Sequence, residues 1–111
     1  RAQKLQKRAS RTGFDWDNVE DAIAKLDEEI GELRDAISDS ERAEEAGDLL
    51  FAAVNVCRLA GIDAESALKA ANAKFERRFR AMESIAGTDF EKLELVEQDA
   101  LWQQVKAAER G

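Results

Sequence analysis

Two short segments of the sequence carry acidic side chains in the same arrangement. Glu29-Ile30-Gly31-Glu32 and Glu45-Ala46-Gly47-Asp48 both read Glu-x-Gly-acid. Carboxylates three residues apart lie on the same face of a helix, close enough to share one cation. Mg²⁺ takes oxygen ligands and usually keeps water or substrate phosphates in its shell. Two facing pairs can therefore hold one or two such ions. The candidate ligands are Glu29, Glu32, Glu45 and Asp48.

Each segment has a glycine directly before its last acid. A glycine inside a helix costs roughly 1 kcal/mol relative to alanine, so it usually has a packing or functional reason. At Gly31 and Gly47 the missing side chain would let helices, or a substrate, approach closely. The alternative is a solvated acidic surface, since 24 of the 111 residues are acidic. A solvated acidic surface explains either pair alone. When both pairs are considered together, a solvated surface and a metal site are about equally well supported.

Several other chemistries are disfavoured by what the sequence lacks. The chain has no histidine and one cysteine. These counts argue against a di-iron site built on Glu-x-x-His pairs and against a zinc site, and they exclude a histidine-based catalytic triad. Neither a Walker-type phosphate loop nor a dinucleotide-binding glycine pattern occurs.

Basic residues flank an aromatic seam further along the chain. Lys74 and Arg78 are four residues apart, beside Phe75 and Phe79. Cationic side chains beside an apolar seam can bind phosphate oxygens, and arginine can do so with two hydrogen bonds. The alternative is an ordinary basic helix face whose aliphatic stems cover the core.

Trp102 and Lys106 repeat this spacing near the end of the chain. An indole beside a cation can stack on a nucleobase while the ammonium meets phosphate. Alternatively, Trp102 fills the end of the core. Phe14 and Trp16 have the same ambiguity, because a hydrophobic staple at the start of a helix also explains them.

The elements that must position these residues are helices. The apolar spacing is helical throughout, and proline is absent. In the second predicted helix, apolar residues recur at alternating steps of four and three, which is typical of a helix in a bundle. The third predicted helix is apolar on nearly all sides from Leu49 onward, which favours a place at the centre of a bundle. Short connections predict antiparallel neighbours and a four-helix-type bundle with a short N-terminal helix. The predicted helices span about 1–11, 17–37, 41–60, 63–85 and 89–110, the last with a possible break near residues 95–96.

Composition sets the broader limits. A chain of 111 residues with 44% hydrophobic content forms one domain, whose small size makes a dimer advantageous. The net charge of −7 argues against a nucleic-acid partner. No apolar run suits a membrane, and the single Cys57 predicts a reducing compartment, the cytoplasm. Because Met82 is the only methionine, we expect an excerpt of a longer chain.

The joint pattern resembles a known family. The two acidic pairs, Ala71-Asn72-x-Lys74-Phe75-x-Arg77-Arg78-Phe79 and Leu101-Trp102-Gln103-Gln104-Val105-Lys106 are similar to motifs of MazG-type nucleoside triphosphate pyrophosphohydrolases. The opening residues through Gly13-Phe14-Asp15-Trp16 resemble the start of that family's C-terminal catalytic domain. The resemblance covers nearly the whole chain.

The resemblance implies an all-α domain, at least dimeric, that uses Mg²⁺, or Mn²⁺ in its place, to hydrolyse NTP or dNTP to the monophosphate and pyrophosphate. It implies metal-ligating and catalytic roles for the four acids named above. It implies nucleotide contacts for Lys74, Arg78, Trp102 and Lys106. The alternative is a catalytically silent bundle that binds nucleotides or a protein partner, against which stands the presence of all four acids.

Overall fold

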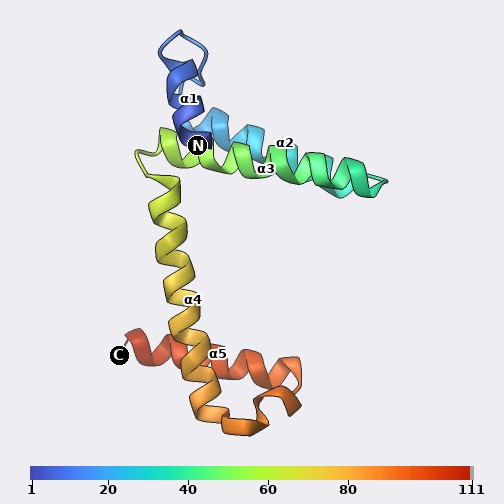
Figure 1. The fold of residues 1–111 in the computed structure, drawn as a ribbon, viewed down its shortest axis with the longest axis vertical. Helices are drawn as coiled ribbons and strands as arrows, with labels where there is room; N and C mark the ends of the chain where they lie inside the picture. Colours follow the sequence, from blue (N-terminus) through green and yellow to red (C-terminus); the bar gives the residue numbers. More distant parts are fainter. Residues whose placement is uncertain (111) are drawn as a thin grey trace. The chain divides into compact units, whose positions relative to one another are not determined.

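The computed structural model describes residues 1–110 and is all-α, as predicted (Figure 1). No strand occurs within this range. The elements are α1 (Ala2–Ser10), α2 (Val19–Asp35), α3 (Asp39–Leu59), α4 (Ala64–Ala86), the 3₁₀ helix η1 (Gly87–Lys92) and α5 (Leu95–Arg110).

The ends of the central helices follow from local capping chemistry. The Asn18 side chain accepts a hydrogen bond from the Asp21 N–H at 2.9 Å, and Ser38 Oγ accepts one from Glu41 at 3.1 Å. Such caps satisfy backbone donors that a helix start leaves unpaired. At the other end of α3, Gly61 has φ +78°, a conformation that favours glycine. The predicted boundaries therefore agree with the structure to within about two residues here.

The last predicted helix was placed too early. Residues 87–92 form a 3₁₀ helix, and α5 begins only at Leu95. Leu93 has extended backbone, with ψ 145°, which interrupts helical geometry. The break predicted near residues 95–96 therefore lies at 93–94, and the segment before it is a separate element.

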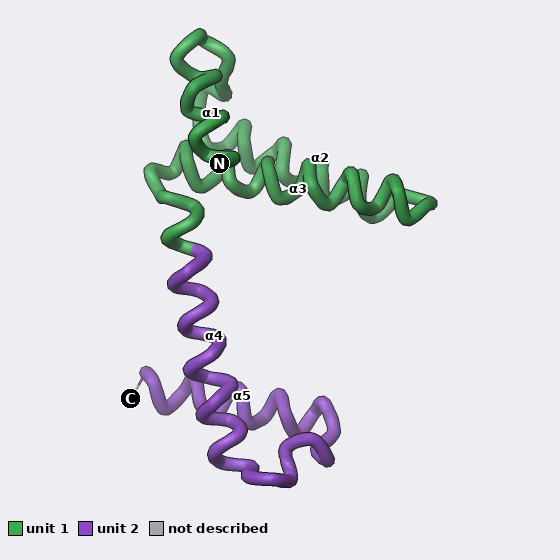
Figure 2. Tube along the Cα trace, viewed as in Figure 1, with its two compact units in different colours: residues 1–67 green, residues 68–111 purple. Residues whose placement is uncertain are grey.

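The chain divides into two compact units, residues 1–67 and the residues from 68 onward (Figure 2). In the first unit, α2 and α3 lie side by side as a helical hairpin with a three-residue connection, and α1 contacts α3 (Figure 1). The boundary falls inside α4, so the first unit also contains the start of that helix. This unit holds both acidic segments.

Two glutamines fasten α1 to the rest of the first unit. The Gln6 amide nitrogen donates to the backbone oxygen of Phe51 at 2.8 Å. The Gln3 amide nitrogen donates to Ile62 O at 3.1 Å, and its oxygen accepts from the Ala64 N–H at 2.7 Å. Gln6 therefore ties α1 to α3, and Gln3 ties it to the segment that follows α3.

The loop after α1 is held by an ion pair. Arg58 on α3 donates to both carboxylate oxygens of Asp15, one of them at 3.1 Å. The Asp15 carboxylate also accepts from the Trp16 backbone N–H at 2.8 Å. The Arg58 guanidinium holds the pKa of Asp15 below its usual value.

Asp15→Asn is expected to lower the free energy of unfolding at pH 7 by about 1 kcal/mol, because a charge-assisted pair in a partly exposed position is lost. Since the folded-state pKa of Asp15 is depressed, this stabilisation is present above the unfolded pKa and is lost as pH falls through the folded one. Urea unfolding at pH 7 measures it. Asp17→Asn, at an exposed neighbour, is the control. Equal stabilities for Asp15→Asn and the parent chain would contradict the role of this pair.

The second unit is built on aromatic contacts. Phe75 packs against Phe79 and Trp102, with ring centroids 5.9 and 5.7 Å apart, and Phe79 meets Phe90 of η1 edge-on at 5.3 Å. Such pairs stabilise beyond their buried area. Met82 on α4 and Val105 on α5 are buried.

Much apolar surface is left uncovered in the single chain. Of the hydrophobic residues in 1–110, only Ala22, Ala52, Met82 and Val105 are buried. On α3, which was predicted to lie at the centre of a bundle, Leu50 is 65% exposed. Within the chain, α3 is covered by α2 and α1, so a four-helix bundle and a dimer stay predictions. No helix in residues 1–110 combines the length and hydrophobicity needed to cross a membrane.

Candidate active site

Three of the four predicted acids come together on the α2–α3 hairpin. Glu29 and Glu32 project from α2 and Glu45 from α3, and one carboxylate oxygen of each lies within 4.8 Å of the others. Glu29 is buried, Glu45 half-buried and Glu32 exposed. The antiparallel pairing of the two helices therefore brings acids 13 or more residues apart in sequence into one cluster.

Mutual repulsion in this cluster is relieved by a shared proton. The hydrogen bond between Glu45 and Glu32 raises the pKa of Glu45 to about 7, helped by partial burial and by the negative charges of Glu32, Asp48 and Glu29. One of two adjacent carboxyl groups thus holds a proton near neutral pH. A cation that displaced this proton would relieve the same repulsion.

The cluster offers oxygen atoms that are free to bind a cation. Glu29 Oε2 and Glu45 Oε2 are buried and have no hydrogen-bond partner in the part of the chain that the structure describes. A buried acceptor without a partner is costly and calls for a ligand, ion or water. All the donors are carboxylate oxygens, which suit hard cations such as Mg²⁺. The residues present therefore fit a magnesium site.

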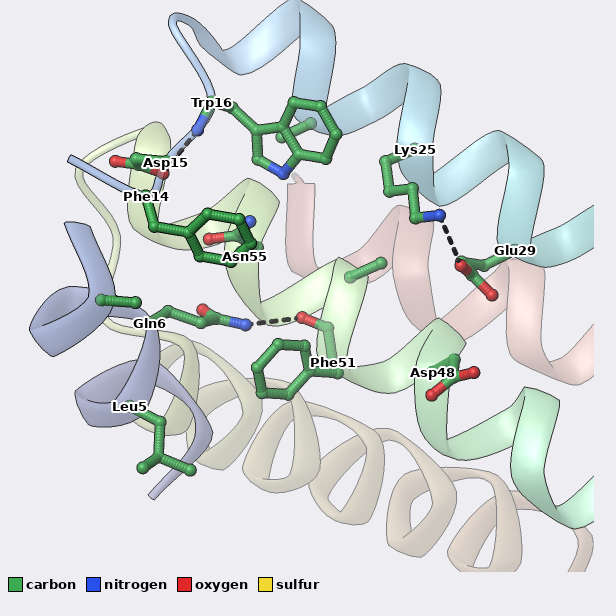
Figure 3. Close-up of a pocket in the computed structure, with 13 residues that line it drawn as sticks. Leu5, Gln6, Phe14, Asp15, Trp16, Lys25, Glu29, Asp48, Phe51 and Asn55 are labelled. Atoms are coloured by element: carbon green, nitrogen blue, oxygen red, sulfur yellow. Dashed lines mark hydrogen bonds and ion pairs between the residues drawn. The ribbon is translucent and has the colours of Figure 1, made fainter. Parts of the chain in front are cut away.

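Asp48 lies outside the three-oxygen cluster. It is exposed, three residues after Glu45 on α3, and its charge contributes to the raised pKa of Glu45. Its side chain lines a pocket together with Glu29 (Figure 3). Asp48 thus lines the pocket beside Glu29, which is itself a member of the cluster.

This pocket has a volume of about 430 Å³ and is lined by residues of α1, the loop that follows it, α2 and α3. Its two ends differ in chemistry. Figure 3 shows Phe14, Trp16 and Phe51 at one end, and Lys25, Glu29 and Asp48 at the other. An apolar cavity that ends in charged groups suits a ligand with a flat apolar part and a charged part.

Lys25 is a site residue that the sequence analysis missed. Its ammonium lies 3.1 Å from Glu29 and 3.5 Å from Glu28, and hydrogen bonding to Glu29 raises its pKa. The sequence feature that could have indicated Lys25 is its position four residues before Glu29, because this spacing places both side chains on one helix face. The loop aromatics Phe14 and Trp16 also line the pocket.

The predicted nucleotide-contacting residues all lie in the second unit. The Arg78 guanidinium carbon is 5.4 Å from the centre of the Trp102 ring, and Arg78 Nε donates to Glu109 at 2.9 Å. A cation over an indole face is attracted by the ring quadrupole. Lys74 on α4 is exposed and Lys106 on α5 is half-buried.

The space beside the two helical glycines is open in the single copy described. A Cβ atom added to Gly31 or Gly47 would meet nothing within 4 Å among residues 1–110. No neighbouring helix of this copy therefore needs glycine at either position. The close approach of a substrate, or of a helix from a second copy, stays a prediction.

Fold and site together define a helical protein with a cluster of three carboxylates beside a largely apolar pocket. The chain belongs to the MazG nucleotide pyrophosphohydrolase domain family, whose model matches residues 17–82. The match includes the whole α2–α3 hairpin and most of α4. The family membership inferred from the motifs is therefore confirmed.

Similar proteins cover nearly all of the chain. It is 46% identical to a nucleoside triphosphate pyrophosphohydrolase of Escherichia coli K12 over 98% of its length. It is 40% identical over 97% of its length to a protein of Thermotoga maritima named nucleoside triphosphate pyrophosphohydrolase/pyrophosphatase MazG. A segment covering 60% of the chain is 44% identical to the Bacillus subtilis protein YabN. The chain spans 44% of the length of each of the first two relatives.

Proposed function

We propose that the chain hydrolyses nucleoside triphosphates, NTP or dNTP, to the monophosphate and pyrophosphate in a Mg²⁺-dependent reaction. The observation that carries this proposal is the carboxylate cluster with unpartnered buried oxygens, placed beside a pocket with one apolar and one charged end. The names of the E. coli and T. maritima relatives support it.

In this proposal Glu29, Glu32, Glu45 and Asp48 hold the cation on the rigid α2–α3 hairpin. Bound Mg²⁺, for which Mn²⁺ can substitute, would neutralise charge on the phosphate chain and favour ionisation of a water. A carboxylate of the cluster accepts the proton of the attacking water. The water oxygen bonds to the α-phosphorus, the bond from that phosphorus to the α–β bridging oxygen breaks, and pyrophosphate leaves.

Lys74, Arg78, Trp102 and Lys106 are proposed to contact the nucleotide. Lys25 is a further cation at the charged end of the pocket, where it can meet phosphate once Glu29 binds the metal ion. Cations aimed at phosphoryl oxygens stabilise the charge that develops during the reaction.

Arg78→Met is expected to lower kcat/KM by about tenfold, because one charge-assisted contact to phosphate is lost. Arg77→Met is the matched control: Arg77 also contacts Glu109, at 3.3 Å, but it is the more exposed of the two arginines. Steady-state hydrolysis with both variants measures the difference. Similar losses in the two variants would remove Arg78 from the site.

We further propose a homodimer. The exposed apolar residues of the first unit include Ile23, Ile30 and Leu50 on the α2–α3 hairpin. Burying such surface against a second copy would stabilise both chains. Sedimentation equilibrium tests this: a monomer at the concentrations used for hydrolysis would refute it. The cytoplasm remains the proposed location, because the free Cys57 suits a reducing compartment.

Product analysis tests the proposed reaction. The protein is incubated with each NTP and dNTP and Mg²⁺, with and without EDTA, and the products are separated. Monophosphate plus pyrophosphate, abolished by EDTA, is the expected result. Diphosphate plus phosphate would mean that a different bond is cut. Binding without turnover would favour the catalytically silent module.

A further inference from the structure

The apolar end of the pocket contains one buried polar side chain, Gln6. Only 6% of this residue is exposed. Its amide nitrogen donates to Phe51 O at 2.8 Å, which fixes the orientation of the amide. The other half of the amide, Oε1, is buried and has no hydrogen-bond partner within residues 1–110. The wall of the pocket therefore contains a hydrogen-bond acceptor that has no partner among residues 1–110.

An unused buried acceptor is expensive. Burying such a group without a partner costs about 1–3 kcal/mol, and most buried polar groups in proteins are paired. The amide cannot turn to satisfy its oxygen without giving up the bond from its nitrogen to Phe51. A ligand that brings an N–H group to this position would satisfy Oε1.

A second polar group in the pocket has the opposite character. Asn55 Oδ1 accepts two hydrogen bonds from Arg58, at 3.1 and 2.8 Å. Because Arg58 occupies this oxygen, the group that Asn55 can offer a ligand is its amide N–H. One acceptor and one donor thus belong to the same pocket wall, on α1 and α3 respectively.

The surroundings favour a flat ligand between these groups. Phe14, Trp16 and Phe51 line the same end of the pocket (Figure 3). Aromatic side chains stack on nucleobases of any type. The edges of nucleobases present an N–H donor next to a ring-nitrogen or carbonyl acceptor, which complements a Gln6 acceptor and an Asn55 donor.

We propose that Gln6 Oε1 is a specificity-determining acceptor that binds the N–H donor on the edge of the substrate's base in this pocket. This inference rests on the proposed function for the identity of the substrate, and it assigns the base to the first unit. A site built to bond an N–H rejects an analogue that lacks it, because its buried polar group is left unpaired. The base would lie at the apolar end, with the phosphates toward Lys25, Glu29 and Asp48.

The test compares ATP with purine riboside 5′-triphosphate, which lacks the amino group and has no N–H on that edge of the ring. If CTP is the better substrate, CTP and its analogue without the 4-amino group are used instead. The parent chain is expected to favour the nucleotide with the amino group by roughly tenfold in kcat/KM. Gln6→Met, which matches glutamine in length but lacks the amide, is expected to bring the ratio to about one.

Gln3→Met is the matched control. Gln3 also fastens α1 through its amide, but it does not line the pocket. It is expected to lower the melting temperature and keep the tenfold ratio. If Gln6→Met does not fold, the test rests on the ratio of the two kcat/KM values measured with the parent chain. A ratio near one overturns the proposal. A ratio that survives in folded Gln6→Met overturns it as well.

Failure of the proposed function would look different. No hydrolysis of any nucleotide would refute the reaction while leaving the pocket testable. The acceptor role of Gln6 is then tested by calorimetry, in which the parent chain and Gln6→Met are each titrated with adenosine and with purine riboside. Binding of adenosine that is roughly tenfold tighter than that of purine riboside, and lost in Gln6→Met, supports the acceptor; equal or absent binding overturns it.

Discussion

Glu45→Gln is expected to lower kcat/KM by roughly 10³ while making the metal-free protein more stable at pH 8. A metal ion contributes several kcal/mol of transition-state stabilisation, and each 1.36 kcal/mol is tenfold in rate. The amide of glutamine has almost the shape of the carboxylate but lacks its charge. Loss of a ligand therefore removes most of that stabilisation with little change in packing.

The stability of the metal-free protein changes in the opposite direction. The hydrogen bond with Glu32, partial burial and the charges of the neighbouring carboxylates raise the pKa of Glu45 to about 7. Above pH 7 its carboxyl group is therefore ionised beside Glu32, Asp48 and Glu29. A neutral glutamine removes this repulsion, and its amide N–H can donate to Glu32 in place of the shared proton. Thermal unfolding in EDTA at pH 8 should therefore show a higher melting temperature for the variant.

Glu44→Gln is the matched control. Glu44 is the adjacent residue, is exposed, and does not belong to the carboxylate cluster. It should retain activity, and its melting temperature should stay close to that of the parent chain. Full activity in folded Glu45→Gln would refute the site. A lower melting temperature for that variant would show that Glu45 stabilises the hairpin even without metal.

The helices and the acidic cluster were accessible from the sequence because both depend on local rules. A 3.6-residue period, the caps at Asn18 and Ser38 and the glycine at position 61 determine where helices begin and end. Once α2 and α3 form a hairpin, acids spaced three apart on each helix face one another. The sequence could therefore predict that Glu29, Glu32 and Glu45 meet.

The pocket was not accessible in the same way. It depends on contacts between residues far apart in the chain, such as Arg58 with Asp15 and Gln6 with Phe51. No local pattern states that a glutamine on the first helix is buried with one half of its amide unpaired. Lys25 was missed for a related reason, because a lysine on an acidic helix is indistinguishable from a solvated one until the cavity beside it is known.

The apparent affinity for Mg²⁺ is expected to fall about tenfold for each pH unit below 7. Glu45 holds a proton in the metal-free protein with a pKa of about 7, and a ligating carboxyl must release it. One proton released per ion gives this slope well below the pKa and little dependence above it. Titration with Mg²⁺ at pH 5.5, 6.5, 7.5 and 8.5, followed by calorimetry in buffers of different ionisation enthalpy, measures both slope and proton count.

The same proton determines how the stability of the metal-free protein varies with pH. Because the folded-state pKa of Glu45 lies above its usual 4.5, the folded state holds more protons than the unfolded state between these values. Stability in EDTA should therefore fall as pH rises from about 5 to 8, and saturating Mg²⁺ should abolish this trend, because the ion keeps Glu45 ionised in the folded state as it is in the unfolded state. Asp15 and Glu109 have depressed pKa values, so their effect on stability falls at lower pH. The change between about pH 5 and 8 is therefore assigned to Glu45. Glu45→Gln should flatten the slope in EDTA, and an unchanged slope in that variant would assign the titration to another group.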